Sequence, residues 1–164
     1  MSNDQHEPLE VVVSRLLVAQ KQTLSIAESC TGGLITHRLT NVAGSSAYFI
    51  GAIIAYAYEA KVAALGVSWE TLNRFGAVSA ETVSAMARGV RERLASTLGL
   101  AITGIAGPGG ATPDKPVGLT YIALASESDI LIERHIWCGD RMQNKEQSAE
   151  AALALLRTYL ERMQ

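Results

Sequence analysis

Hydrophobic positions recur along the chain with two spacings, one typical of amphipathic helices and one typical of short buried strands. After Pro8, apolar residues three or four apart predict an N-terminal helix with the stripe Leu9, Val12, Val13, Leu16 and Leu17. Short apolar or alternating runs predict strands over residues 24–27, 48–56, 100–103, 117–125 and 130–138.

Helices are predicted over residues 34–42 and 59–65. Three further helices are predicted, each beginning after a capping residue. Ser68 is a helix N-cap and Gly76 is suited to end that helix. Ser79 opens the next helix, and Asp140 caps the last one. Their apolar stripes are Val83, Met86, Ala87, Val90 and Leu94, and Ala149, Leu153, Leu156 and Leu160.

Alternation of helices and strands predicts an α/β fold, a three-layer α/β/α sandwich with a mixed, mainly parallel sheet. The few polar residues at 126–129 join the last two strands as an antiparallel hairpin. No linker or repeat divides the chain, so residues 1–164 are read as one domain. The functional crevice of such folds lies at the carboxyl ends of strands, where this chain carries Ser29, Tyr56 and Thr103.

Composition narrows the class of protein. Hydrophobic residues make up 48% and charged residues 18%, which excludes disorder, and a net charge of −2 predicts no nucleic-acid partner. Two cysteines without zinc spacing predict no metal site and a cytoplasmic location. The polar start predicts no signal peptide, and the apolar run at 52–57 is too short to span a membrane.

Ser29 stands at a predicted strand-to-helix turn and is followed by Thr31, Gly32 and Gly33. The first N–H groups of a helix lack partners, so a serine there faces a ready-made anion or oxyanion site. The alternative is that Ser29 or Thr31 only caps the helix. Cys30 is a second candidate nucleophile, although an inert buried thiol is its ordinary state.

Lys61 follows the strand end at Tyr56, and burial would lower its pKa enough for it to act as a general base. The alternative is a solvated lysine on an exposed helix. The segment 104–110, with Gly104 and Gly107, resembles a nest of N–H groups for an anion, or is a glycine-rich turn with unusual φ angles. Arg141 at the start of the last helix is a candidate phosphate ligand.

These residues belong to segments that together resemble the CinA C-terminal domain, the nicotinamide-nucleotide amidohydrolase family. The segments are Ala27-Glu28-Ser29-Cys30-Thr31-Gly32-Gly33, Gly44-Ser45-Ser46-Ala47-Tyr48-Phe49, Tyr56 with Glu59-Ala60-Lys61, Leu65-Gly66-Val67, Gly76-Ala77-Val78-Ser79, Thr103-Gly104-Ile105-Ala106-Gly107-Pro108, Lys115-Pro116-Val117-Gly118 and Gly139-Asp140-Arg141. The resemblance covers residues 9–160, nearly the whole chain.

The resemblance implies a deamidase that converts nicotinamide mononucleotide and water to nicotinate mononucleotide and ammonia without a metal or organic cofactor. It implies Ser29 as the nucleophile, Lys61 as its base and Tyr56 as a supporting hydroxyl, with Thr103 as a second hydroxyl nearby. The family pattern and the apolar helices favour a homodimer or a higher homo-oligomer, and no membrane partner is expected.

The residues and the family resemblance together indicate one site. N–H groups around Thr31, Gly32 and Gly33 would stabilise the oxyanion. The turn Gly44, Ser45 and Ser46, the loop with Gly104 and Gly107, and Arg141 are the candidate phosphate ligands.

The chain departs from the family pattern in two places. Ala57-Tyr58 replaces Ser-Asn before Glu59, and Lys145 stands where arginine is common. A lysine cannot reproduce a bidentate phosphate contact. A catalytically weak paralogue that binds a nucleotide or a protein partner is therefore the alternative function. Phosphate transfer is a weaker third reading, because no carboxylate cluster indicates a magnesium site.

Overall fold

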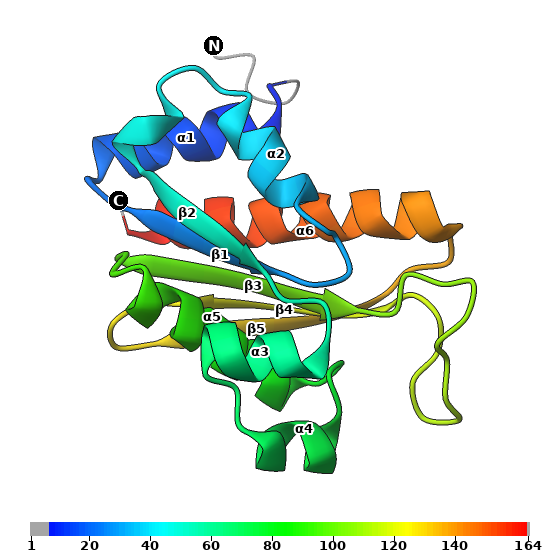
Figure 1. Cartoon of the computed structure of the whole chain (residues 1–164). Helices are drawn as coiled ribbons and strands as arrows, with labels where there is room; N and C mark the ends of the chain where they lie inside the picture. The colour runs from blue at the N-terminus through cyan, green and yellow to red at the C-terminus, as the bar shows by residue number, and fades with distance from the viewer. Residues whose placement is uncertain (1–6, 164) are drawn as a thin grey trace.

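The computed structural model describes residues 7–163, and these residues form five strands in one sheet (Figure 1). The strands are β1 (Leu24–Glu28), β2 (Phe49–Ile54), β3 (Leu98–Gly104), β4 (Leu119–Ala125) and β5 (Ile130–Ile136). Their order across the sheet is β2-β1-β3-β4-β5. β2, β1 and β3 are parallel, and β4 is antiparallel to both of its neighbours. Since β5 then runs with the first three strands, the prediction of a mixed, mainly parallel sheet is confirmed.

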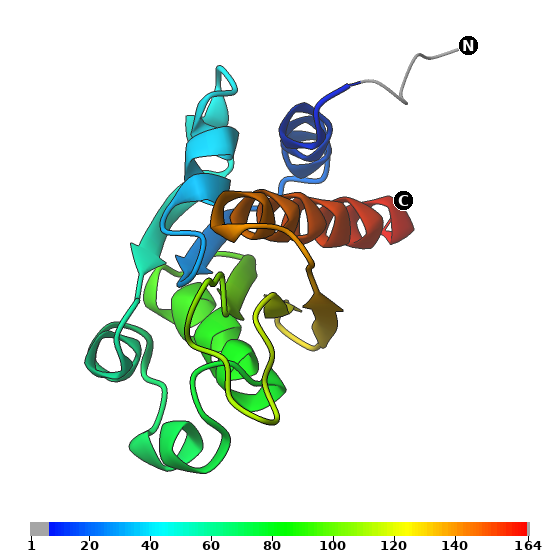
Figure 2. The ribbon, with the colours of Figure 1, turned by 90° about the vertical axis from the view of Figure 1, so that its right-hand side faces the viewer.

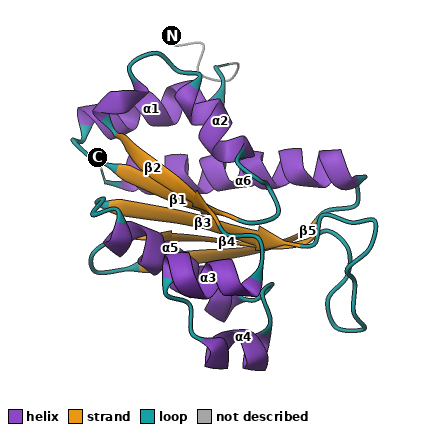
Figure 3. Ribbon diagram, viewed as in Figure 1, coloured by secondary structure: helices purple, strands orange, loops and turns teal. Residues whose placement is uncertain are grey.

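Helices cover both faces of this sheet (Figure 3). On one face lie α1 (Leu9–Ala19), α2 (Leu34–Thr40) and α6 (Arg141–Arg162), and on the other α3 (Tyr58–Leu65), α4 (Trp69–Phe75) and α5 (Ala80–Arg93). A short 3-10 helix, η1 (Ser45–Ala47), precedes β2. Each face has its own hydrophobic core, so β1 and β3 are buried from both sides. The three-layer sandwich is therefore confirmed.

The predicted helix caps form as expected. Ser68 Oγ accepts a hydrogen bond from the Thr71 N–H, and Ser79 Oγ accepts one from the Thr82 N–H. Asp140 forms a reciprocal capping box with Gln143 at the start of α6. These local hydrogen bonds satisfy N–H groups that the first helical turn leaves without partners.

Several predicted boundaries were too wide. β2 covers 49–54 rather than 48–56, and the helix predicted over 34–42 ends at Thr40. β4 begins at Leu119 rather than at 117, and β5 ends at Ile136 rather than at 138. At the last two strands the cause is Gly118, which has a φ of +90° and a backbone conformation unlike a strand. A Cβ there would lie 1.9 Å from the Trp137 carbonyl oxygen, so this close approach requires glycine.

None of the helices formed by residues 7–163 is both long and apolar enough to cross a membrane. Most of the polar N-terminal segment, on which the expectation of no signal peptide rests, lies outside the described residues.

Candidate functional site

Ser29 lies directly after β1, at the carboxyl edge of the parallel strands. Its N–H donates to the Ile102 carbonyl of β3 over 3.2 Å, which holds the residue against the neighbouring strand. Two glycines with positive φ, Gly32 at +61° and Gly33 at +104°, then reverse the chain into α2. The Ser29 side chain is buried, so its hydroxyl lies below the protein surface at this edge of the sheet.

Lys61 of α3 reaches this serine from across the site. Its Nζ is 2.9 Å from Ser29 Oγ, 2.7 Å from the Ala55 carbonyl oxygen and 3.1 Å from the Tyr56 carbonyl oxygen. An ammonium group would donate to all three oxygens. A neutral amine would donate its two N–H groups to the carbonyls and turn its lone pair to the serine hydroxyl. The arrangement therefore fits a lysine that exchanges a proton with Ser29.

The environment of Lys61 favours the neutral amine more than water does. Its side chain has no exposed surface, and this desolvation lowers the pKa of Lys61 from the usual 10.5 to about 8, while the nearby Cys30 acts weakly in the opposite direction. A pKa in this range leaves an appreciable neutral fraction near physiological pH. The alternative of a solvated lysine on an exposed helix is wrong, because the packing of α3 buries this side chain.

Cys30 is next to the serine, but its environment opposes ionisation. Burial raises the pKa of the Cys30 thiol to about 12, and the negative charge of Glu28 adds to this effect. A thiol with such a pKa stays protonated at neutral pH and is a poor nucleophile. The structure thus supports the interpretation of Cys30 as an inert buried thiol.

Glu28 is a buried carboxylate that the sequence reasoning missed. Its two oxygens accept hydrogen bonds from the Thr31 hydroxyl at 2.7 Å, the Ile35 N–H at 2.9 Å, and the Thr36 N–H and hydroxyl at 3.2 and 2.8 Å. A negative charge at this end of α2 also complements the helix dipole. A carboxylate directly after the predicted strand 24–27 was the available signal.

This arrangement settles the alternative of a simple capping role. The N-cap of α2 is Gly33, and no side chain of Ser29 or Thr31 caps the helix. The Thr31 hydroxyl instead donates to Glu28. The cap-only alternative is therefore wrong, because Glu28 takes the N–H groups that a capping serine would bind.

The expected oxyanion donors are only partly available. The Gly32 N–H donates to the Ser29 carbonyl over 3.1 Å and is already engaged. The N–H groups of Thr31 and Gly33 donate no hydrogen bond to any group among residues 7–163. These two groups are thus available in the serine turn, as is the Cys30 N–H, which also donates to no group among residues 7–163.

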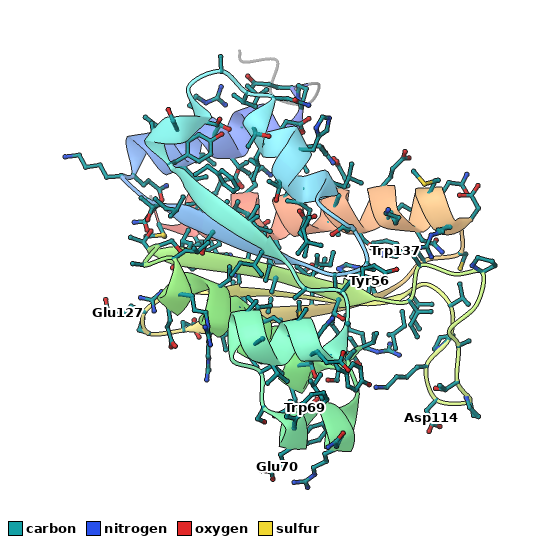
Figure 4. The ribbon with its side chains drawn as sticks, in the orientation of Figure 1. Tyr56, Trp69, Glu70, Asp114, Glu127 and Trp137 are labelled. Carbon is teal, nitrogen blue, oxygen red and sulfur yellow. The ribbon has the colours of Figure 1, made fainter. Side chains whose placement is uncertain are left out.

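Tyr56 and Thr103 lie at the predicted edge, but their hydroxyl groups contact other partners. Tyr56 is 60% exposed at the end of β2 (Figure 4), and its hydroxyl accepts from Nη2 of Arg141 over 3.2 Å. Lys61 contacts the carbonyl of Tyr56 rather than its hydroxyl. Thr103 is buried and donates to the Ala77 carbonyl over 2.8 Å. Supporting roles for these two hydroxyls stay predictions.

Arg141 and the glycine-rich loop meet beside Tyr56. Nη1 of Arg141 donates to the Gly107 carbonyl over 2.8 Å, so the guanidinium links this loop to Tyr56. Asn144, about one turn further along α6 and not singled out from the sequence, donates to the Ala106 carbonyl over 3.0 Å. Gly104 is the last residue of β3, where a Cβ would lie 2.7 Å from the Thr120 hydroxyl. The loop is therefore fastened to α6 at the carboxyl edge.

The two departures from the family pattern leave the serine–lysine pair in place. Tyr58 begins α3, and its hydroxyl accepts from the Ala77 N–H over 3.2 Å. Lys145 lies on α6 four residues after Arg141, and its Nζ is 3.8 Å from where a Cβ on Gly32 would stand. A cation therefore still borders the serine turn.

The turn of Gly44, Ser45 and Ser46 is not brought to this site within one chain. It precedes β2, whereas Ser29 and Lys61 lie near the end of that parallel strand. Six strand residues span about 20 Å at ~3.3 Å per residue. The expectation that the turn faces the same crevice as Ser29 is therefore wrong for the single chain. Because β1 and β2 are parallel, the end of β2 lies beside Ser29, and the turn that precedes β2 lies at the opposite end of both strands.

Metal ligands were not predicted, and we assign none. Among residues 7–163, no three His, Cys, Asp or Glu side chains are grouped closely enough to hold a metal ion.

The family model of the CinA C-terminal domain matches residues 6–160. The chain belongs to the CinA C-terminal domain family. A CinA-like protein of Salinibacter ruber is 49% identical over 152 residues, which are 93% of this chain and 37% of that protein. The chain thus spans a little over a third of the length of such curated relatives.

Solved structures match over almost their whole length. A competence-damaged protein (CinA) superfamily protein from Klebsiella pneumoniae has a TM-score of 0.91 at 32% identity, covering 94% of this chain and 96% of that one. The competence/damage inducible protein CihA from Agrobacterium tumefaciens has a TM-score of 0.88 at 37% identity, covering 93% and 95%. The CinA fold is therefore shared along more than nine-tenths of the chain.

Proposed function

We propose that this domain is an amidohydrolase that converts nicotinamide mononucleotide and water to nicotinate mononucleotide and ammonia. The observation that carries the proposal is the buried contact of 2.9 Å between Lys61 Nζ and Ser29 Oγ. A serine beside a desolvated amine is the pairing expected of an activated nucleophile. The pyridine nucleotide as substrate comes from membership of the CinA family and from the resemblance of the site motifs.

In the first half of the reaction, Ser29 Oγ attacks the carboxamide carbon while neutral Lys61 accepts the hydroxyl proton. The N–H groups of Thr31 and Gly33 donate to the oxyanion that forms, in a turn that Glu28 holds in shape. Lys61 then returns its proton to the departing nitrogen, which leaves as ammonia. A nicotinoyl ester on Ser29 remains.

In the second half, water attacks the ester carbon and Lys61 accepts a proton from it. Collapse of the intermediate releases the carboxylic acid, which loses its proton to water, and the proton on Lys61 passes back to Ser29 Oγ. One amide bond is broken and one water molecule is consumed. No cofactor takes part in these steps.

The phosphate of the substrate would be bound at the rim of the site by Arg141, whose guanidinium is held by Gly107 and Tyr56. Lys145 adds a second positive charge one turn further along α6. The Tyr56 hydroxyl would contact the nucleotide bound at this rim. We expect the protein in the cytoplasm, where nucleotides of this kind are made and used.

A direct assay tests the proposal. Purified protein is incubated with nicotinamide mononucleotide, and both ammonia and nicotinate mononucleotide are quantified for the parent, Ser29→Ala and Lys61→Met. We expect both variants to lose about a thousandfold or more in turnover. Ser84→Ala, a serine on α5 away from the site, is the matched control and should keep the parent rate.

Circular dichroism and thermal melts establish that each variant is folded. A folded parent that binds nicotinamide mononucleotide and releases no ammonia would overturn the amidohydrolase proposal in favour of a nucleotide-binding module. Turnover that survives in Ser29→Ala would place the nucleophile elsewhere.

A further inference from the structure

A cavity with a volume of about 430 Å³ opens beside the end of α4. It lies between this helix end, the segment 76–78 that follows, and the loop 105–115 after β3. Figure 2 shows this loop next to the segment that joins α4 to α5. Small-molecule sites usually have volumes of about 300–1,000 Å³, so the cavity has room for a ligand.

Two cations face this cavity without a counter-ion. Arg74, in the last turn of α4, holds its Cζ 5.1 Å from the centre of the Phe75 ring and makes no hydrogen bond or ion pair within the described chain. Lys115 reaches in from the loop, and its Nζ donates to the Phe75 carbonyl over 2.5 Å. The described residues that line the cavity include no aspartate or glutamate. Two positive charges are thus left without a neutralising carboxylate.

Hydrogen-bond donors are also in excess here. A guanidinium has five N–H donors and an ammonium has three, of which Lys115 uses one for a backbone carbonyl. The Tyr58 hydroxyl accepts from the Ala77 N–H over 3.2 Å and donates its own proton to no group among residues 7–163. A Cβ on Gly76 would lie 2.8 Å from Lys115 Nζ and 3.8 Å from the Tyr58 hydroxyl oxygen, so these two donors converge. An anion with several acceptor oxygens would satisfy them.

Apolar side chains complete the lining. Val78 and Ile105 are half-buried at the cavity, and the rings of Tyr58 and Phe75 also line it. A bare inorganic anion would leave this apolar surface in contact with water. A ligand that has a flat ring as well as an anionic group would cover it, and the burial would favour binding.

Ala77 separates this cavity from the Ser29 site. Its N–H donates to the hydroxyl of Tyr58, which lines the cavity, and its carbonyl accepts from the hydroxyl of Thr103 at the sheet edge over 2.8 Å. None of the side chains that we assign to catalysis or to the substrate phosphate lines the cavity. A ligand bound there would therefore use a different set of residues from the substrate.

We propose that this cavity binds a nucleoside monophosphate, with the phosphate on Arg74, Lys115 and Tyr58 and the base against Val78 and Ile105. A phosphate monoester has a charge of about −1.5 to −2 at pH 7 and three terminal oxygens, which match two cations and a hydroxyl donor. A carboxylate offers one charge and two oxygens. The proposal does not rest on the amidohydrolase activity, because binding is measured without turnover.

Calorimetric titration with adenosine 5′-monophosphate tests the site. We expect the parent to bind, and Arg74→Gln to raise the Kd about 10-fold or more, because it removes a charged hydrogen bond to the phosphate. Arg141→Met, which alters the proposed substrate site, should bind the nucleotide as tightly as the parent. Arg88→Gln is the matched control, since it removes an exposed arginine of α5 that does not line this cavity, and its Kd should equal that of the parent.

Fragments of the nucleotide test the two halves of the cavity. Adenosine lacks the phosphate and inorganic phosphate lacks the base, so each should bind about 10-fold or more weakly than the whole nucleotide. Equal affinity for inorganic phosphate and for the nucleotide would overturn the assignment of the apolar side chains to a base. Lys115→Met should weaken nucleotide binding as Arg74→Gln does. If circular dichroism shows that Lys115→Met is unfolded, Arg74→Gln decides.

Amide chemical shifts in two-dimensional NMR spectra locate the ligand. Adenosine 5′-monophosphate should shift the amide signals of residues 74–78 and 105–115 and leave those of the Ser29 turn unchanged. Absence of both heat and shifts at millimolar nucleotide would overturn the proposal. Binding that is lost in Arg141→Met and kept in Arg74→Gln would place the nucleotide at the Ser29 site, and this too would overturn it.

Discussion

The protonation of Lys61 makes a quantitative prediction about the pH dependence of turnover. Burial lowers the pKa of Lys61 to about 8, and only the neutral amine accepts the proton of Ser29. About one-tenth of the protein then has neutral Lys61 at pH 7, half at pH 8 and about nine-tenths at pH 9. We therefore expect kcat/KM to rise about fivefold from pH 7 to pH 8, and less than twofold from pH 8 to pH 9.

The assay is steady-state ammonia release at limiting nicotinamide mononucleotide between pH 6.5 and pH 9.5. A phosphate monoester has its second pKa near 6, so above about pH 7 the substrate contributes little to the profile. Lys61→Arg keeps the positive charge and should be inactive at every pH, because a guanidinium does not lose its proton. A parent profile that is flat from pH 7 to pH 9 would refute the assignment of Lys61 as the base.

The same group has a signature in stability. The folded protein releases the Lys61 proton near pH 8, whereas the unfolded chain holds it up to about 10.5. Between these values the unfolded state binds more protons, so the contribution of Lys61 to the free energy of unfolding rises with pH. Thermal melts of the parent and of Lys61→Met from pH 8 to pH 10.5 should show this rise in the parent only.

Three further substitutions test neighbouring assignments. Arg141→Met should raise the KM for nicotinamide mononucleotide about 10-fold or more, because it removes a charged hydrogen bond to the phosphate. The KM for nicotinamide riboside, which lacks the phosphate, should change little. An equal effect on both substrates would contradict a phosphate contact. Glu28→Ala should lower the free energy of unfolding by ~1–3 kcal/mol in urea titrations, because it leaves buried donors of α2 unsatisfied, and Glu28→Gln should lose less. Cys30→Ala should keep turnover within severalfold of the parent in the ammonia assay, and a loss comparable to that of Ser29→Ala would make the thiol essential.

The secondary structure was largely predictable because its signals are local. Apolar spacing located the helices and strands, and Ser68, Ser79 and Asp140 capped helices as their sequence positions indicated. Apart from the short helix η1, which was not predicted, errors lay at element ends. At Gly118, a close approach to Trp137 makes β4 begin at Leu119 rather than at 117. Such an approach joins residues that are distant in sequence, and no local pattern reports it.

The candidate site was predictable in part. Parallel strands end at one edge of the sheet, and this placed Ser29, Tyr56 and Thr103 together. Lys61 was a candidate base because it follows the strand end at Tyr56, and the family resemblance strengthened that assignment. The contacts within that edge were not predictable, since Tyr56 meets Arg141 and Thr103 meets Ala77. The strand topology, rather than the motif, decided that the Gly44–Ser46 turn lies at the other end of β2.

By itself, the sequence determined the class of fold, the order of its elements and the family, because periodicity, caps and motif spacing are properties of neighbouring residues. The tertiary structure alone decided that Lys61 is buried 2.9 Å from Ser29 and that Glu28 binds the first turn of α2. Both facts depend on segments that meet only when the sheet and its helices pack together. The shift in the pKa of Lys61 has the same origin, since desolvation arises from every element that covers the side chain.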